Sequence, residues 1–161
     1  MNRKAKGFTL LEVIIVMAIS AIAMTLIVSI FITGVKIFSN SDVKTTLQMD
    51  AKDIQENISD IIMQGSKAEI ISDGIKVSQV NEGTEKSIEI KKNGNELYID
   101  KLDLSGNEIA NTKSILTTNL ADCNFELKDN SVKVIINLEK KSGYANEKYP
   151  IKFTVTFRNK S

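Results

Sequence analysis

The apolar residues of this chain fall into two regions with different spacing. Residues 8–38 form an apolar run that is interrupted only by Glu12 and Lys36, and no charged residue lies from Val13 to Val35. A membrane-spanning helix needs about 20 apolar residues to cross about 30 Å of hydrocarbon. The run therefore predicts one membrane helix, with the basic N-terminus expected on the cytoplasmic side and the rest of the chain outside.

A cleaved secretory signal is a poor match to the same run. Signal peptides have an apolar region of about 7–15 residues that ends at a small-residue cleavage site. Here the apolar run is far longer, and no small-residue site with polar flanks follows it. A plain signal anchor, which tethers the chain without being cut, remains open as an alternative.

A second helical pattern follows the polar residues 39–42. Apolar side chains recur mostly at steps of three, four and seven, with charged residues on the other faces, which predicts an amphipathic helix with one apolar stripe. The stripe consists of Val43, Leu47, Ile54, Ile58, Ile61 and Ile62. We expect Gly34 and residues 39–42 to bend the helix, and Gly65 to end it. A continuous helix over residues 8–64 would be roughly 85 Å long.

From Ala68 onward apolar and polar residues alternate, which is the period of a β-strand. Hairpins are predicted with turns at Asp73-Gly74, at Asn93-Gly94 and at residues 128–131. The last strand is predicted to begin at Pro150, and residues 139–149 are expected to form a loop. Its inward-facing residues are expected to be Ile151, Phe153, Val155 and Phe157.

These patterns predict an α+β fold in which the amphipathic half of a long helix covers an antiparallel β-sheet. The expected divisions are a leader at residues 1–7, a membrane helix at 8–38, an amphipathic helix at 39–65 and an extracytoplasmic sheet domain at 66–161. Neither the order of the strands nor the ligand of the sheet domain follows from the sequence.

Composition excludes several kinds of site. The chain has no His and a single cysteine, Cys123, so His-based triads, His metal sites and intramolecular disulfides are impossible. We interpret Cys123 as a small buried apolar residue. No phosphate-binding loop motif is present, the acidic residues are scattered, and neither an enzyme activity nor a cofactor is expected.

The net charge of +1 gives no sign of a nucleic-acid partner. The only candidate basic patch lies near the last strand, and we interpret it as a solvated face. It consists of Lys140, Lys141, Lys148 and Lys152.

The most informative stretch is KGFTLLEVIIVMAIS at residues 6–20. A short basic leader ends at Gly7, Phe8 follows, and Glu12 lies four residues farther on at the start of the apolar run. This arrangement resembles the prepilin leader and N-terminal helix of type IV pilins and of the pseudopilins of related secretion and DNA-uptake machines. The resemblance is close over residues 3–36 and extends to the rest only as a long helix followed by an antiparallel sheet.

The resemblance implies processing and assembly. A membrane prepilin peptidase would cut after Gly7, where the missing side chain allows close approach to the backbone, and would methylate the new amine of Phe8. The implied partners are this peptidase, other pilin subunits, an inner-membrane assembly platform and, before assembly, membrane lipid. The mature protein would move from the cell membrane into a surface filament.

Glu12 needs a physical reason to lie so close to the membrane span. An ionised side chain at the centre of a bilayer costs about 2.5–3.5 kcal/mol on insertion scales. One explanation is that Glu12 lies near the membrane surface and reaches toward water. The resemblance implies another, in which Glu12 meets the Phe8 ammonium of a neighbouring subunit and sets the register of assembly.

Departures from the family pattern favour a minor pilin or pseudopilin. Ala21 and Ser29 occupy positions where many major pilins have Gly and Pro, and one cysteine cannot form the C-terminal disulfide loop of many pilins. Pilus, type II secretion and competence systems share this N-terminal pattern and are not distinguished by it. The alternative function is a single-pass anchored binding protein or adhesin that does not enter a filament.

Overall fold

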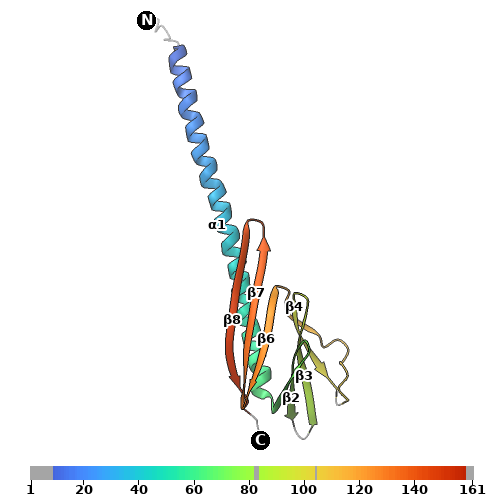
Figure 1. Ribbon diagram of the computed structural model, residues 1–161. Coiled ribbons are helices and arrows are strands. Elements are labelled where there is room, and N and C mark those ends of the chain that lie inside the picture. Colours follow the sequence, from blue (N-terminus) through green and yellow to red (C-terminus); the bar gives the residue numbers. More distant parts are fainter. Residues whose placement is uncertain (1–8, 82–83, 104, 159–161) are drawn as a thin grey trace, which may run out of the picture.

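The computed structural model describes residues 9–81, 84–103 and 105–158. Its longest element is one helix, α1 (Leu10–Gln64, 55 residues), whose first half projects beyond the β-strands while its second half lies against them (Figure 1). The α+β fold class, with a long helix packed on antiparallel strands, is confirmed.

Helix α1 is continuous through residues 39–42, where the sequence led us to expect a bend. The hydroxyls of Thr45 and Thr46 donate to the backbone oxygens of Ser41 and Asp42, at 2.8 and 3.0 Å. Such bonds are compatible with a continuous helix, and the lower helix propensity of these polar residues is too small to interrupt it.

The second half of α1 buries the predicted stripe. Its buried residues are Val43, Leu47, Ala51, Ile54, Ile58 and Ile62. Ile61 is partly buried at the edge of this core. The helix ends where predicted, at Gly65, but for a packing reason. The φ of Gly65 is −69°, which any residue adopts, whereas an added Cβ would lie 2.6 Å from Cγ1 of Val77.

The strands form two antiparallel sheets. The first has five strands in chain order: β1 (Lys67–Ile71), β2 (Gly74–Asn81), β3 (Thr84–Asn93), β4 (Glu96–Leu102) and β5 (Ser114–Thr117). The second has three: β6 (Leu120–Lys128), β7 (Ser131–Ser142) and β8 (Ala145–Thr156). Strands β7 and β8 run along α1 and extend farthest toward its exposed half (Figure 1).

Two predicted turns shift by one residue. Ile71 pairs with Gly74, and Asn93 pairs with Glu96, so the turns lie at residues 72–73 and 94–95. The backbone of Gly94 has a φ of 58°, which favours glycine at the first turn position.

The loop predicted at residues 139–149 is wrong. Strands β7 and β8 continue through this segment and leave only Gly143 and Tyr144 in the turn. The strands lack apolar alternation here, but they pair Glu139 with Lys148 and Lys140 with Glu147. Opposite charges across an antiparallel pair stabilise this part of the hairpin, where Ala145 is buried and Tyr149 packs against the core. Pro150, predicted to open the last strand, lies within β8, which is an edge strand where a missing donor is tolerated.

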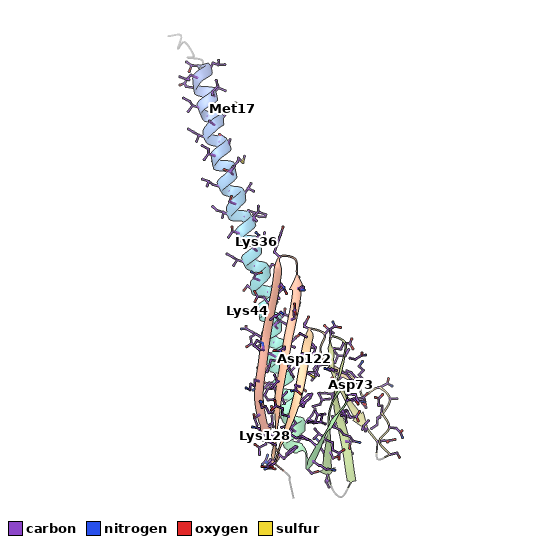
Figure 2. The ribbon with its side chains drawn as sticks, in the orientation of Figure 1. Met17, Lys36, Lys44, Asp73, Asp122 and Lys128 are labelled. Carbon is purple, nitrogen blue, oxygen red and sulfur yellow. The ribbon has the colours of Figure 1, made fainter. Side chains whose placement is uncertain are left out.

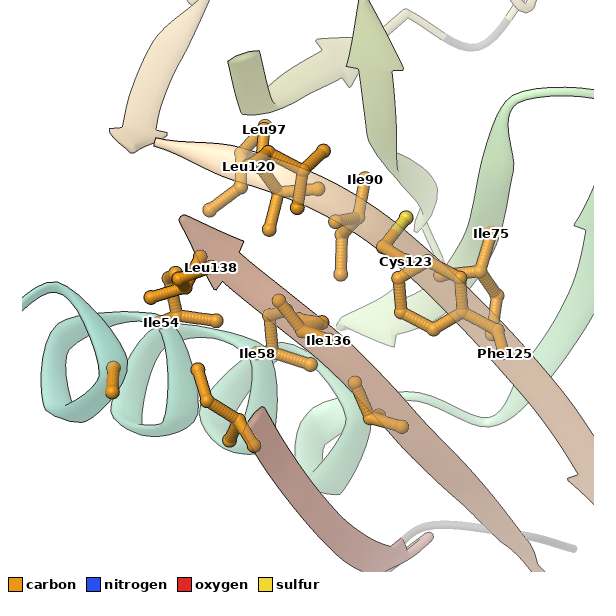
Figure 3. Close-up of a cluster of buried hydrophobic side chains, with 14 of the residues drawn as sticks. Ile54, Ile58, Ile75, Ile90, Leu97, Leu120, Cys123, Phe125, Ile136 and Leu138 are labelled. Atoms are coloured by element: carbon orange, nitrogen blue, oxygen red, sulfur yellow. The ribbon is translucent and has the colours of Figure 1, made fainter. Parts of the chain in front are cut away.

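One core joins the helix to both sheets (Figure 3). Side chains of Ile75, Ile90 and Leu97 from the five-stranded sheet meet those of β6, β7 and α1. The predicted inward face of the last strand is confirmed, with Ile151, Val155 and Phe157 buried and Phe153 partly buried. Cys123 is 8 % exposed within this core, as its interpretation as an apolar residue requires.

A polar contact ties α1 to the junction between the sheets. The Thr117 hydroxyl at the end of β5 donates to Oδ2 of Asp50 at 2.7 Å, and the Asn119 amide donates to the same oxygen at 2.8 Å. Thr117 is 5 % exposed. The carboxylate of Asp50 therefore holds the helix against the chain where it passes from one sheet to the other.

Candidate functional site: the exposed half of the long helix

The first half of α1 projects beyond the sheets (Figure 1). Residues 9–38 are all exposed, and large apolar side chains such as Leu10, Ile30 and Phe31 are 81 %, 73 % and 72 % exposed. Within the described residues, α1 is the one helix long and apolar enough to cross a membrane. A soluble monomer rarely leaves so large an apolar surface open, so this half-helix is a surface for lipid or for other chains.

The polar side chains inside the apolar span are compatible with lipid. The hydroxyls of Thr25, Ser29 and Thr33 donate to backbone oxygens one turn earlier, at 2.7, 2.8 and 2.9 Å. Each hydroxyl donor is thereby satisfied within the helix. A helix that satisfies its own polar groups is what a bilayer interior requires.

The helix begins with a capping box. Thr9 is the N-cap residue, and its hydroxyl accepts from the backbone N–H of Glu12 at 3.3 Å. The Glu12 carboxylate accepts in return from the Thr9 backbone N–H at 2.8 Å and from the Thr9 hydroxyl at 2.9 Å. Two backbone donors that have no intrahelical partner are satisfied in this way.

This arrangement gives Glu12 a role that the sequence reasoning missed. The signal was present, because Thr9-Leu10-Leu11-Glu12 fits the Ser/Thr-x-x-Glu pattern of a capping box. The negative charge of Glu12 lies at the helix N-terminus, where the helix dipole favours it. The structure therefore positions the carboxylate in the first turn of α1, and in the sequence Glu12 is four residues beyond Phe8, the predicted mature N-terminus. Gly7 and Phe8 themselves lie outside the described residues.

The charged groups of the sheet domain pair with one another instead of converging on a cleft. Lys91 contacts the carboxylates of Glu89 and Glu108, the latter at 3.2 Å, and the hydrogen bond that it donates to Glu89 raises the pKa of Lys91 well above its usual value. Lys133 bonds Glu126 at 2.7 Å and lowers the pKa of that carboxyl. Among the described residues no group of three or more His, Cys, Asp or Glu side chains could hold a metal ion.

Comparison with known proteins bears on the same N-terminal segment. Residues 2–28 match the family described as the prokaryotic N-terminal methylation motif. Searches of curated proteins and of solved structures find no match to the chain. The match includes the basic leader, the capping box and the first part of the apolar half-helix, and it stops before the sheet domain.

Proposed function

We propose that the chain is a type IV pilin-like protein, a membrane-anchored substrate of prepilin peptidase, and that it enters a filament through α1 as a minor pilin or pseudopilin. The observation that supports the proposal is that the apolar first half of α1 is exposed along its whole length and overlaps the matched methylation motif at residues 2–28. An apolar surface that fits lipid also fits neighbouring helices of the same kind. The half-helix can therefore leave the bilayer when equivalent helices replace the lipid around it.

The proposed processing site is the peptide bond between Gly7 and Phe8, followed by methylation of the new Phe8 amine. Unmodified α-amino groups have a pKa of about 7.7–8.0, and a methylated amine is also a cation at neutral pH. The new amine would lie directly beside Thr9, whose backbone N–H already bonds Glu12. The capping box thus holds a carboxylate near the position where a cation is created.

Glu12 is proposed to bond the Phe8 ammonium of a neighbouring subunit. A buried pair of this kind adds little net stability, because both charges lose their water. It does specify register, since a subunit that slipped along the filament would leave both charges unpaired among apolar side chains. The proposed role of Glu12 in assembly is therefore distinct from its bonds within α1.

Substitutions at two residues separate these roles. Glu12→Gln keeps the capping box, because Gln also occurs at this position of the motif, but removes the negative charge. Thr9→Ala removes the cap and keeps the charge. We expect Glu12→Gln and Glu12→Ala to be made and cut normally but to be largely absent from sheared filaments, and Thr9→Ala to be incorporated at a level closer to wild type.

The measurement is the ratio of each variant in the sheared filament fraction to that in the membrane fraction. Normal incorporation of Glu12→Gln would contradict the proposed ionic contact. If Thr9→Ala were lost from filaments to the same degree, the cap and not the charge would explain the effect.

The minor-subunit assignment is supported by the sequence departures at Ala21 and Ser29 and by the lone, buried Cys123. The proposed partners are other pilin subunits and an inner-membrane assembly platform. The proposed topology has a cytoplasmic N-terminus and an extracytoplasmic sheet domain. The alternative, an anchored binding protein outside any filament, predicts no cleavage after Gly7 and tolerance of any apolar sequence at residues 8–35.

A further inference from the structure

The turn between β7 and β8 lies at the level where the membrane span ends. Lys36 is the first charged residue after Glu12, and the helix between them is about 36 Å long at about 1.5 Å per residue. This length slightly exceeds the roughly 30 Å of hydrocarbon in a bilayer. Lys36 is therefore expected among the lipid headgroups on the side of the sheet domain.

Two contacts hold the turn at this level. The Lys36 ammonium lies 5.6 Å from the centre of the Tyr144 ring, and the Ser39 hydroxyl donates to the backbone oxygen of Ser142 at 3.1 Å. Gly143 has a φ of 56°, which permits the tight turn, and Ala145 beyond it is buried. Figure 2 shows Lys36 on the helix beside the end of this hairpin.

The side chains at the turn fit a headgroup layer better than water. Tyr144 is 71 % exposed, and Phe38 on the adjacent helix turn is 76 % exposed. Tyrosine has an apolar ring and a polar hydroxyl, and such residues gather where membrane and water meet. An exposed aromatic ring beside the end of a membrane helix therefore has a natural environment in the lipid.

The charged residues next to the β7–β8 turn favour contact with anionic lipid. Positive residues exceed negative ones over residues 36–44 and 139–148. The positive residues are Lys36, Lys44, Lys140, Lys141 and Lys148, and the negative ones are Asp42, Glu139 and Glu147. Glu139 lies 3.6 Å from both Lys141 and Lys148, and Glu147 pairs with Lys140. Residues 139–148 keep an excess of one positive charge.

We propose that the β7–β8 turn is a second membrane contact, in which Tyr144 enters the headgroup layer and the hairpin lysines bind the phosphate groups of anionic lipids. The contact fixes the height and tilt of the sheet domain while the chain is still in the bilayer. It rests on the membrane anchoring of α1 and not on filament assembly. Failure of filament assembly therefore leaves this contact standing, and failure of this contact leaves the proposed assembly standing.

The chain contains no tryptophan, so one substitution supplies a unique fluorescent probe. Tyr144→Trp places the probe at the turn and preserves an aromatic ring for Lys36. Leu127→Trp is the matched control, because Leu127 is 41 % exposed and lies beside the β6–β7 turn at the other end of the same sheet. Circular dichroism of both variants checks that the fold is retained.

The full chain is reconstituted in phosphatidylcholine vesicles with and without phosphatidylglycerol. Emission is quenched either by a nitroxide placed on the lipid near the headgroup or by acrylamide in the water. We expect the Tyr144→Trp probe to be quenched by the lipid nitroxide and shielded from acrylamide, more so with phosphatidylglycerol, and the Leu127→Trp probe to behave in the opposite way.

Charge is tested in the Tyr144→Trp background. Replacing Lys140 and Lys141 by Gln is expected to lower the ratio of docked to undocked turn by about tenfold in phosphatidylglycerol vesicles, and replacing both by Arg is expected to preserve it. Equal quenching of the two probes by the lipid nitroxide would overturn the proposal. Shielding from acrylamide that appears only when duplex DNA is added would also overturn it, because this result assigns the turn to nucleic acid. Shielding that disappears when the protein is diluted in lipid would overturn it as well, because this result assigns the turn to a second copy of the chain.

Discussion

The contact made by Asp50 offers a direct test of how α1 is held to the sheet domain. In Asp50→Ala two hydrogen bonds to a carboxylate are lost, from Thr117 at 2.7 Å and from Asn119 at 2.8 Å. Hydrogen bonds to charged groups contribute about 1.5–3 kcal/mol each, and the Thr117 hydroxyl would remain buried after losing its acceptor.

Two effects reduce the loss of stability expected for Asp50→Ala. Asp50 is only partly buried, so water replaces some of the lost bonding. Alanine is also a better helix former than aspartate, by about 0.5 kcal/mol. We therefore expect Asp50→Ala to lower the free energy of unfolding by about 2–3 kcal/mol.

Asp53→Ala is the matched control, because Asp53 is exposed on the same helix and undergoes the same change in helix propensity. We expect it to leave stability unchanged or to raise it slightly. The assay is urea unfolding of the full chain in detergent micelles, followed by the near-ultraviolet circular dichroism of the tyrosines. If the two variants unfold within about 0.5 kcal/mol of each other, the Asp50 contact does not hold the helix as argued.

Three further predictions concern the sheets. Gly74→Ala would place a Cβ 1.8 Å from the backbone oxygen of Ile90, so β2 and β3 must separate. We expect the free energy of unfolding in urea to fall by about 3 kcal/mol or more. A urea midpoint equal to that of the wild type would refute this prediction. Burial raises the pKa of Cys123, so its alkylation at pH 8 should be slow until the protein is unfolded, and fast labelling of the native chain would contradict its burial. Lys133 lowers the pKa of Glu126 in the folded protein, so the Glu126 carboxylate stabilises the fold above its unfolded pKa and loses this effect as pH falls through its folded pKa. Glu126→Gln should therefore make the free energy of unfolding less sensitive to acid. An unchanged dependence of stability on pH would argue against the Lys133–Glu126 pair.

Hydrophobic periodicity predicted the parts of this fold that bury an apolar face. The helical stripe that includes Leu47, Ile54 and Ile58 and the alternation from Ile151 to Phe157 both correspond to buried positions. Periodicity identifies such elements because burial of one face is what stabilises them. Periodicity does not identify an element that is stabilised by interactions other than burial of an apolar face.

The errors occur where polar interactions decide the structure. The paired charges of Glu139 and Lys148 lie in a part of the hairpin that has no regular apolar alternation. Residues 39–42 are polar, yet they lie within the continuous helix α1. The division into two sheets depends on how distant strands pack, which no local pattern contains. The capping box of Thr9 and Glu12 was readable from the sequence but was overlooked beside the stronger membrane signal.

The central claim is tested most directly by the intact mass of the protein in membranes of a host with its prepilin peptidase and of a strain lacking that enzyme. We expect a form that begins at Phe8 and carries one added methyl group in the first strain, and the full-length chain in the second. A full-length mass in both strains would contradict the account and indicate an uncleaved membrane anchor.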